Sequence, residues 1–327
     1  SSQREIMLPK YSSGEIIVAF IHGSEIDLIC VISGISVGLC SSIDVPCIKS
    51  ILQLNNENLS IEIIIIDNNS KDGSIEDIQE NFPDVKLFIN SENIGFSKGI
   101  NQGAEFARGK YFYILNPDTY IINDNLSLFL KFINQNPNVS ILGPSIINNK
   151  NKIEQSFWRM PTILNTILSI THLDYFNKNK NYNSKLFLNP IEVESISGGA
   201  FFVRASIFKK LNGFDPDLFW MEDIDFCLRN HKINYKTFYL PKAKVFHHKG
   251  KSAKKNISWA TFNQLSSKIK FFKKHHSVSG SNFIKIFILF LSFFKSIILI
   301  GLSIVNRSYF EKLKGYILII KSIIKTK

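Results

Sequence analysis

Residues 61–67 read IEIIIID, a short run of apolar, β-branched side chains that ends on an acid. A run of this length with so few polar residues is typical of a parallel strand that is buried on both faces. The next residues, NNSKDGS at 68–74, form a turn cluster, and we expect a helix from there to about residue 81. The stretch predicts one strand–helix unit of an α/β protein, with Asp67 at the carboxyl end of its strand.

The same alternation continues downstream. Further strands are expected at residues 85–89 and 111–115, each followed by a helix. Successive units of this kind form a parallel sheet, and ligands bind at the carboxyl ends of its strands. The polar residues just after these strands are therefore candidate site residues, namely Asp67, Asn93, Asn116 and Asp118.

Upstream of residue 61 the pattern is less regular. Candidate strands lie at 28–32 and 35–39, followed by a helix at 44–54. Residues 1–25 are expected to form an N-terminal extension to which the sequence assigns no role.

The composition narrows the class of protein. With 327 residues, 45% of them hydrophobic, the chain is long enough for one α/β domain with an appended region and too apolar to be disordered. Its four cysteines include no CxxC pair, which argues against a zinc ribbon and against a disulfide scaffold. A reducing, cytoplasmic compartment is expected.

The net charge of +12 is concentrated towards the C-terminus. Residues 231–327 hold 20 Lys and Arg and a single acid, whereas residues 1–230 hold 19 basic and 26 acidic side chains. A weakly acidic body with a strongly basic tail predicts contact with an anionic surface. Ile, Leu and Phe dominate the tail and motifs that read nucleic-acid grooves are missing, so we expect a membrane surface and no nucleic acid.

The tail contains one long apolar stretch, FIKIFILFLSFFKSIILIGLSIV at residues 283–305, which Lys285 and Lys295 interrupt. Basic and serine side chains recur at spacings of seven and four as far as Lys325, which would place them on one stripe of a continuous helix. This pattern predicts a basic amphipathic helix lying among anionic headgroups. Packing on the body or in a homo-oligomer, and a true membrane span, stay open as alternatives.

Four blocks of sequence together resemble glycosyltransferase family 2, and within it the rhamnosyltransferase-like group. They are IEIIIIDNNSKDGS at 61–74, NIGFSKGINQGAEFARGKYFYILNPDT at 93–119, SGGAFFVRASIFKKLNGFDPDLFWMEDIDFCLRN at 197–230 and AKVFHHKGKS at 243–252. The resemblance implies a GT-A type α/β fold with a mostly parallel, Rossmann-like sheet at residues 26–255. A C-terminal helical, membrane-associating region would follow at 256–327.

The resemblance also implies an activity. The chain is expected to be an inverting transferase that moves a sugar such as rhamnose from a nucleotide-diphosphate donor to a hydroxyl group. The acceptor would be a growing cell-envelope polysaccharide or a lipid-linked glycan. The enzyme would be peripheral on the cytoplasmic face of the cell membrane.

The donor-binding roles that the resemblance implies fall on residues of the first two blocks. Asp67 would accept a hydrogen bond from the base, beside Asn68. Asn116 and Asp118 take the place of the family's DxD motif, with Asp118 as a ligand of Mg²⁺ or Mn²⁺. Glycine and backbone N–H groups at a helix start favour a phosphate, so the second block adds Asn93, Gly95 and Asn101.

The remaining roles fall on the last two blocks. The resemblance places the catalytic base at Asp223, with Glu222 as the next candidate. His247 would be a further metal ligand. The expected cleft and donor contacts are Gly198, Gly199, Trp220 and, in a basic loop over the diphosphate, Lys249. Asp225 lies four residues before Arg229 and is expected to form a structural ion pair with it.

Two other classes of protein stay open. Asn116 replaces the first acid of the DxD motif, which is compatible with a degenerate nucleotide-sugar-binding or scaffold protein. A nucleotidyltransferase also combines an α/β sheet with a carboxylate-bound metal, but no basic loop for a triphosphate is evident early in the chain.

Overall fold

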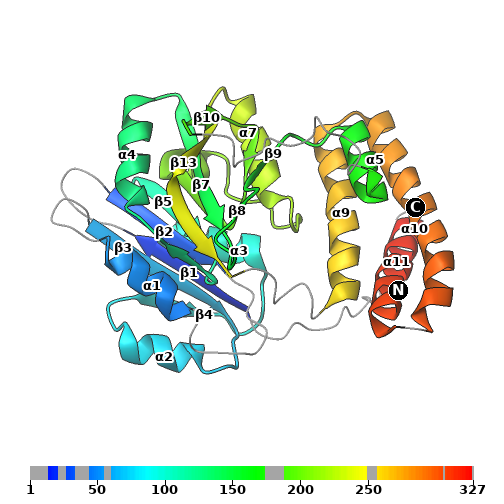
Figure 1. The fold of residues 1–327 in the computed structure, drawn as a ribbon, viewed down its shortest axis with the longest axis horizontal. Coiled ribbons are helices and arrows are strands. Elements are labelled where there is room, and N and C mark those ends of the chain that lie inside the picture. The colour runs from blue at the N-terminus through cyan, green and yellow to red at the C-terminus, as the bar shows by residue number, and fades with distance from the viewer. Residues whose placement is uncertain are drawn as a thin grey trace, which may run out of the picture.

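The computed structural model describes residues 14–20, 27–33, 44–54, 60–173, 188–248, 256–304 and 306–325. The described chain forms an α/β part that runs as far as strand β13, followed by three long helices (Figure 1). These helices lie together on one side of the molecule, and the short helix α5 of the α/β part lies among them (Figure 1).

A large sheet runs through the α/β part, in the order β10-β13-β7-β12-β5-β2-β1-β3-β4. Its strands are β1 (Gly14–Phe20), β2 (Asp27–Ser33), β3 (Ser60–Asn68), β4 (Lys86–Ile89), β5 (Tyr111–Leu115), β7 (Val139–Ile147), β10 (Ile191–Glu192), β12 (Ala200–Arg204) and β13 (Lys236–His247). Short strands β6 (Thr119–Ile121) and β8 (Ile153–Glu154) pair with β13 and β7, whereas β9 (Phe157–Trp158) and β11 (Ser195–Ile196) pair with each other.

The sheet is mixed. Strands pair in parallel at β2–β5, β3–β4 and β7–β13, but β12 lies antiparallel between β5 and β7. Strand β1 lies antiparallel between β2 and β3. The expectation of a mostly parallel sheet is therefore wrong in this detail, and part of the N-terminal extension is a strand of the sheet. The candidate strand at 28–32 is confirmed as β2, and the one at 35–39 lies outside the described residues.

Helices cover both faces of this sheet. In the α/β part they are α1 (Asp44–Leu52), α2 (Ser74–Asn81), α3 (Phe96–Phe106), α4 (Asn125–Gln135), α5 (Ile163–Thr171), α6 (Ala205–Lys210) and α7 (Glu222–Lys232). Alternate residues of β3 feed opposite faces: Ile63 and Ile65 join the cluster under α1 and α4, and Ile64 and Ile66 join the cluster under α3 and α7. Burial on both faces explains why the strand is almost entirely isoleucine.

Helices α9 (Ile257–His275), α10 (Val278–Ser303) and α11 (Arg307–Lys325) form the C-terminal part. Their apolar core also includes Ile170 of α5 and the residues Leu218 and Met221, which lie just before α7. A Cβ atom on Gly315 would lie 2.6 Å from the main-chain oxygen of Ser258, so glycine there permits close packing of α11 on α9. The C-terminal helices are thus packed on the segment that leads to the predicted base.

The predicted polar stripe of the tail is wrong. Helix α10 ends at Ser303 and α11 begins at Arg307, so the spacing does not continue along one helix. Ser292 and Ser296 are buried in the bundle, and the exposed side chains of α10 are instead large and apolar: Phe283, Ile286, Phe290, Phe293, Phe294, Ile297, Ile298 and Ile300. Within the described chain, α10 is the one helix that is long and apolar enough to cross a membrane, by length and composition alone.

Candidate active site

Strands β5 and β12 bring Asn116 and the glycine pair together at one edge of the sheet. The register pairs Leu115 with Ala200, so the next residue of β5 faces the residue before β12. The main-chain N–H of Asn116 donates to the oxygen of Gly199 at 3.1 Å. The place predicted for the DxD motif therefore lies beside the Gly198–Gly199 segment.

The predicted base lies on the other side of the same glycines. Asp223 is in the first turn of α7, and its Oδ2 accepts a hydrogen bond from the N–H of Gly198 at 2.8 Å. Its Oδ1 accepts from the N–H of Ile224 at 2.7 Å. Two main-chain donors fix this carboxylate, so Gly198 and Gly199 link Asp223 to Asn116 across the edge of the sheet.

The predicted metal ligands also meet. Nε2 of His247 lies 3.2 Å from Oδ1 of Asp118, and both side chains are partly exposed. The main chain holds them in register, because β6 pairs with the end of β13 and the N–H of His248 donates to the oxygen of Asp118 at 2.8 Å. Asp118 follows Asn116 by two residues, so one residue separates this pair from the contact between Asn116 and Gly199.

The Asp118–His247 pair fits a cation that bridges a diphosphate better than it fits a closed protein site. No group of three His, Cys, Asp or Glu side chains gathers for a metal in the part of the chain that the structure describes. One carboxylate oxygen and one imidazole nitrogen leave positions for phosphate oxygens and water. Divalent cations at phosphate-transfer sites are often held in this way, by one or two side chains together with the substrate.

The two acids at the start of α7 differ in their surroundings. Burial, and then the nearby charge of Asp223, raise the pKa of Glu222 to about 8, while its Oε2 accepts from the N–H of Met221 at 3.0 Å. Burial also raises the pKa of Asp223, against the hydrogen bond from Gly198. The charge of an ionised Asp223 is one cause of the raised pKa of Glu222, so ionisation of one of these neighbouring carboxyls disfavours ionisation of the other.

The predicted base-binding residues lie at the end of β3. Asp67 is buried, which raises its pKa, and its Oδ2 accepts from the N–H of Ser70 at 3.0 Å. The side chain of Asn68 is bonded to Asn90, with 3.1 Å between Nδ2 of Asn90 and Oδ1 of Asn68. Asp67 thus caps the turn that follows β3, and its contact with a nucleotide base stays a prediction.

The residues predicted from the second sequence block, 93–119, have two different environments in the structure. Gly95 has φ +86° before α3, and its N–H donates to Oδ1 of Asn93 at 2.9 Å, which leaves these two residues at the start of a helix as predicted. Asn101 differs from the prediction, because both ends of its amide bond the main chain of Phe214 at 2.8 Å. Asn101 therefore holds the turn that leads towards α7. Lys249 lies outside the described residues.

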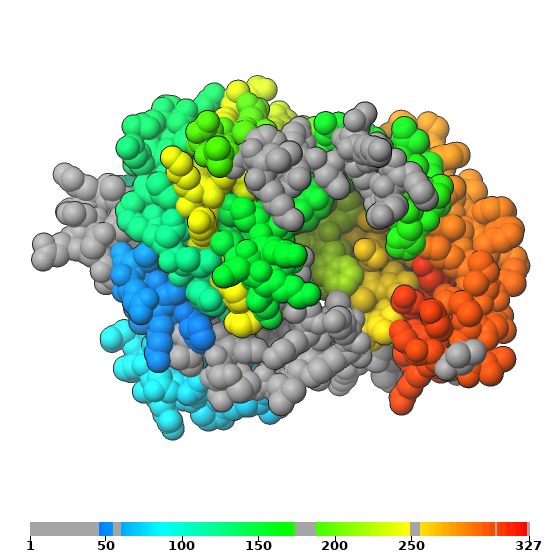
Figure 2. Space-filling model, in the orientation of Figure 1, coloured from blue at the N-terminus to red at the C-terminus, as the bar shows by residue number. Residues whose placement is uncertain are grey.

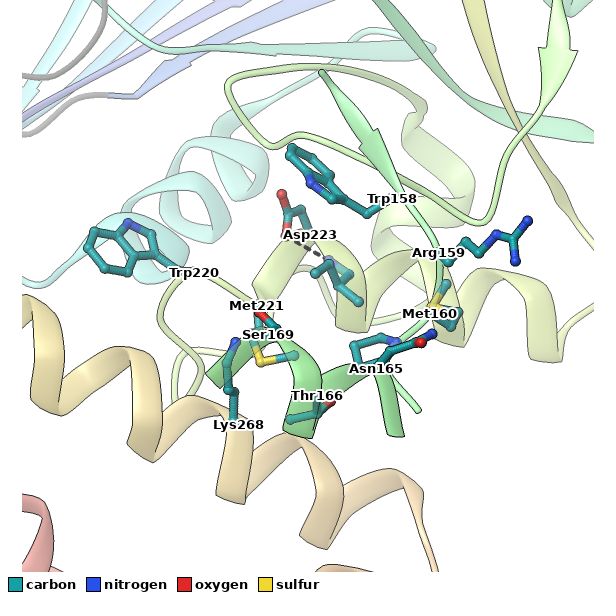
Figure 3. A pocket seen from close by; sticks show the side chains of 12 residues that line it. Trp158, Arg159, Met160, Asn165, Thr166, Ser169, Trp220, Met221, Asp223 and Lys268 are labelled. Carbon is teal, nitrogen blue, oxygen red and sulfur yellow. Dashed lines mark hydrogen bonds between the residues drawn. The ribbon is translucent and has the colours of Figure 1, made fainter. Parts of the chain in front are cut away.

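A cavity of about 310 Å³ opens beside Asp223, between the α/β part and the C-terminal helices. Its wall includes Trp158, Arg159, Met160, Pro161, Asn165, Thr166, Ser169, Trp220, Met221, Asp223, Ile224 and Lys268. In Figure 3 the indoles of Trp158 and Trp220 lie on either side of Asp223, and the side chain of Lys268 rises from α9. The face in Figure 2 is hollowed between the two parts of the molecule.

Several residues of this cavity carry no sequence signal. Trp220 was expected from its place beside the acidic block, and it has φ +63°. Trp158, Lys268 and the polar residues of α5 were not expected, because they stand alone in stretches without a recognisable motif. Only the packing of α5 and α9 against the segment before α7 brings them to Asp223.

The sequence matches one family model and several known proteins. A family model described as Glycosyl transferase family 2 matches residues 45–211. An N-acetylglucosaminyl-diphospho-decaprenol L-rhamnosyltransferase of Mycobacterium tuberculosis is 27% identical over 209 residues, or 59% of this chain and 68% of the relative. Rhamnosyltransferase WbbL of Escherichia coli is 26% identical over 250 residues, or 73% of this chain and 92% of the relative. The family match ends before Asp223 and His247.

The solved structures that match the fold share less sequence identity with this chain than these two relatives do. S. aureus TarS 1-349 shares 14% identity with this chain at a TM-score of 0.46, with 88% of each chain covered. A mannosyltransferase from Pyrobaculum calidifontis, solved with GDP-Man and Mn²⁺, shares 14% identity at a TM-score of 0.45, with 80% of this chain and 76% of that chain covered. At this similarity, neither structure carries an argument about the site.

Proposed function

Because the chain belongs to glycosyl transferase family 2, we propose that it is an inverting rhamnosyltransferase that uses a nucleotide-diphosphate donor and a lipid-linked glycan acceptor. Membership confirms the expected GT-A type of fold and the expected sugar-transferase class. One set of contacts supports the proposal: Asp223 is bonded to Gly198, Asn116 is bonded to Gly199, and Asp118, two residues after Asn116, contacts His247. Rhamnose as the sugar is supported by the names of the two relatives.

In the proposed reaction Asp223 acts as the general base. Its carboxylate faces the cavity and takes the proton of the acceptor hydroxyl as the oxygen attacks the anomeric carbon of the donor sugar. The bond from that carbon to the diphosphate breaks on the opposite face, so the configuration inverts. The N–H groups of Gly198 and Ile224 hold the carboxylate in place for this step.

The diphosphate leaves on the side of Asp118 and His247. These two residues would hold a divalent cation, which supplies positive charge to the departing diphosphate. Asp118 offers the oxygen ligand that Mg²⁺ and Mn²⁺ prefer. The neutral side chain of Asn116, which lies beside Gly199, would leave the first position of the DxD motif without a second carboxylate.

A lipid-linked acceptor implies work at a membrane surface. The name of the mycobacterial relative specifies a diphospho-decaprenol acceptor, and the exposed apolar face of α10 is suited to contact with lipid. We therefore place the enzyme on the cytoplasmic face of the cell membrane, held there by its C-terminal helices.

Product analysis tests the proposed function. The full chain in detergent is incubated with dTDP-, UDP- and GDP-sugars, with and without a polyprenyl-diphosphate-linked N-acetylglucosamine acceptor. Release of nucleoside diphosphate that requires the acceptor, favours a rhamnose donor and falls with EDTA is expected. Release of pyrophosphate would indicate a nucleotidyltransferase, and no release from any donor would favour the scaffold.

A further inference from the structure

We infer that the cavity beside Asp223 is the acceptor subsite and that Lys268 binds the phosphate of a lipid-diphosphate acceptor. The inference rests on the proposed acceptor class and assigns that class a place and a residue. Its basis is the position of one lysine on α9, a helix that lies outside the range of the family match.

Among the lysines of α9, Lys268 is the one that is not exposed, and two of the exposed ones already have partners. Lys270 donates to the main-chain oxygen of Asp217 at 2.8 Å, and Lys274 forms ion pairs with Asp215 and Asp225. Within the part of the chain that the structure describes, no hydrogen bond or ion pair involves the ammonium group of Lys268.

The surroundings of Lys268 favour an anion. The side chain is half-buried in the cavity wall, and this burial lowers the pKa of its ammonium group. A cation that is removed from water without a partner costs free energy, which an anionic ligand would offset. Thr166 and Ser169 of α5 line the same cavity and bring hydroxyl groups that are able to donate to phosphate oxygens.

The order of groups along the cavity matches an acceptor of the form sugar–diphosphate–lipid. The reacting sugar would lie at Asp223 between Trp158 and Trp220, which are 37% and 41% exposed and offer aromatic faces for stacking (Figure 3). The phosphates would follow at Lys268 on α9. At about 310 Å³ the cavity holds a head group and leaves a long lipid outside.

An apolar surface that is suited to the lipid chain lies on the helices next to the cavity. Helix α5, which supplies part of the wall, packs on α10, and both helices expose large apolar side chains, among them Leu164, Phe290 and Ile297. The proposed path therefore runs from Asp223 past Lys268 to the apolar face of the C-terminal helices.

Direct binding tests the inference without any need for sugar transfer. Farnesyl diphosphate and farnesol are titrated into the full chain in detergent with EDTA present, which removes cations from the Asp118–His247 pair. We compare wild type with Lys268→Met, which keeps the apolar stem, Lys268→Arg, which keeps the charge, and Lys273→Met. Lys273 is exposed on the same helix and serves as the matched control.

The expected result is a loss of about tenfold or more in affinity for farnesyl diphosphate in Lys268→Met, with farnesol binding unchanged. Lys268→Arg and Lys273→Met keep wild-type affinity. Equal affinity of wild type and Lys268→Met for farnesyl diphosphate would overturn the inference, and so would wild-type binding of farnesol as tight as that of farnesyl diphosphate.

A second measurement uses only the wild-type chain, in case Lys268→Met does not fold. An amine-acylating reagent labels accessible lysines, and mass spectrometry reads each site with and without farnesyl diphosphate. Protection of Lys268 but not of Lys273 is expected, and equal labelling of Lys268 in both samples would refute the inference. Absence of nucleoside diphosphate release would refute the proposed function alone, since neither binding experiment depends on it.

Discussion

We propose separate roles for the two adjacent acids at the start of α7. Burial raises the pKa of both Glu222 and Asp223, but the carboxylate of Asp223 lines the cavity and is fixed by the N–H of Gly198. We expect Asp223→Asn to lower kcat by about 10²–10⁴-fold, because the acceptor hydroxyl loses its base. Glu222→Gln, which mimics the protonated acid, is expected to stay within a few-fold of wild type. Steady-state release of nucleoside diphosphate measures both, and the reverse ranking would assign the base to Glu222.

The same pair predicts how stability depends on pH. The pKa of Glu222 is raised from 4.5 in the unfolded chain to about 8 in the folded protein. The folded state therefore holds a proton that the unfolded state loses, and the associated stability declines as pH rises from about 5 to 8. Glu222→Gln lacks this decline. Relative to wild type, the variant should be more stable at pH 8 than at pH 5 by at least about 1 kcal/mol in urea unfolding. If the difference in unfolding free energy between Glu222→Gln and wild type did not change with pH, the raised pKa assigned to Glu222 would be wrong.

At the scale of elements, one carboxylate joins α7 to α9. Asp225 is fully buried and contacts Arg229 at 2.7 Å, as predicted, but also His275 at 2.6 Å and Lys274 at 2.8 Å. These partners hold its pKa at about 2, below its usual value, despite burial. The predicted ion pair within α7 is confirmed, and the structure adds a clamp between the helix that carries the proposed base and the C-terminal helices.

The clamp is expected to be needed for stability. Asp225→Asn leaves three basic groups without their carboxylate and should cost about 3–5 kcal/mol at pH 7 in urea unfolding. Because the folded pKa lies below the unfolded value, the contribution is complete above about pH 4 and fades as pH falls towards 2. The loss of unfolding free energy in Asp225→Asn should therefore become smaller as pH falls towards 2. Asp217→Asn, which changes an exposed acid before α7, serves as the control, and an equal loss in both variants would count against the clamp.

At the scale of the whole molecule, local signals predicted the strand–helix units well. Strand β5 has the predicted bounds, because an apolar run between turn residues specifies a buried strand by itself. The pairing of β1 between β2 and β3, and the packing of α10 against α9 and α11, depend on contacts between distant segments. The candidate site was predictable to the same extent. Asp118, Asp223 and His247 lie in motifs that the sequence shows, but Trp158 and Lys268 reach the cavity only through tertiary packing.

The orientation of α10 is the clearest consequence of that packing. The long apolar helix was expected to present a stripe of basic and serine side chains to anionic headgroups, but the bundle buries Ser292 and Ser296 and exposes rings and branched side chains. Water would solvate this face unfavourably, whereas a bilayer would bury it. The net positive charge of the C-terminal region favours an anionic bilayer in particular.

This orientation predicts that charge on the apolar face releases the enzyme from membranes. Ile286, Phe290 and Ile297 are 65%, 61% and 53% exposed at helical spacing on α10. Changing all three to Glu should lower sedimentation with anionic liposomes by more than about tenfold, since each buried apolar side chain contributes about 1.5–3 kcal/mol. Activity on a detergent-dispersed acceptor should persist. Leu188→Glu, at an exposed site on the α/β part, is the control. Unchanged sedimentation of the triple variant would exclude α10 as the lipid contact, and loss of a dimer in ultracentrifugation would assign the face to a second copy of the chain.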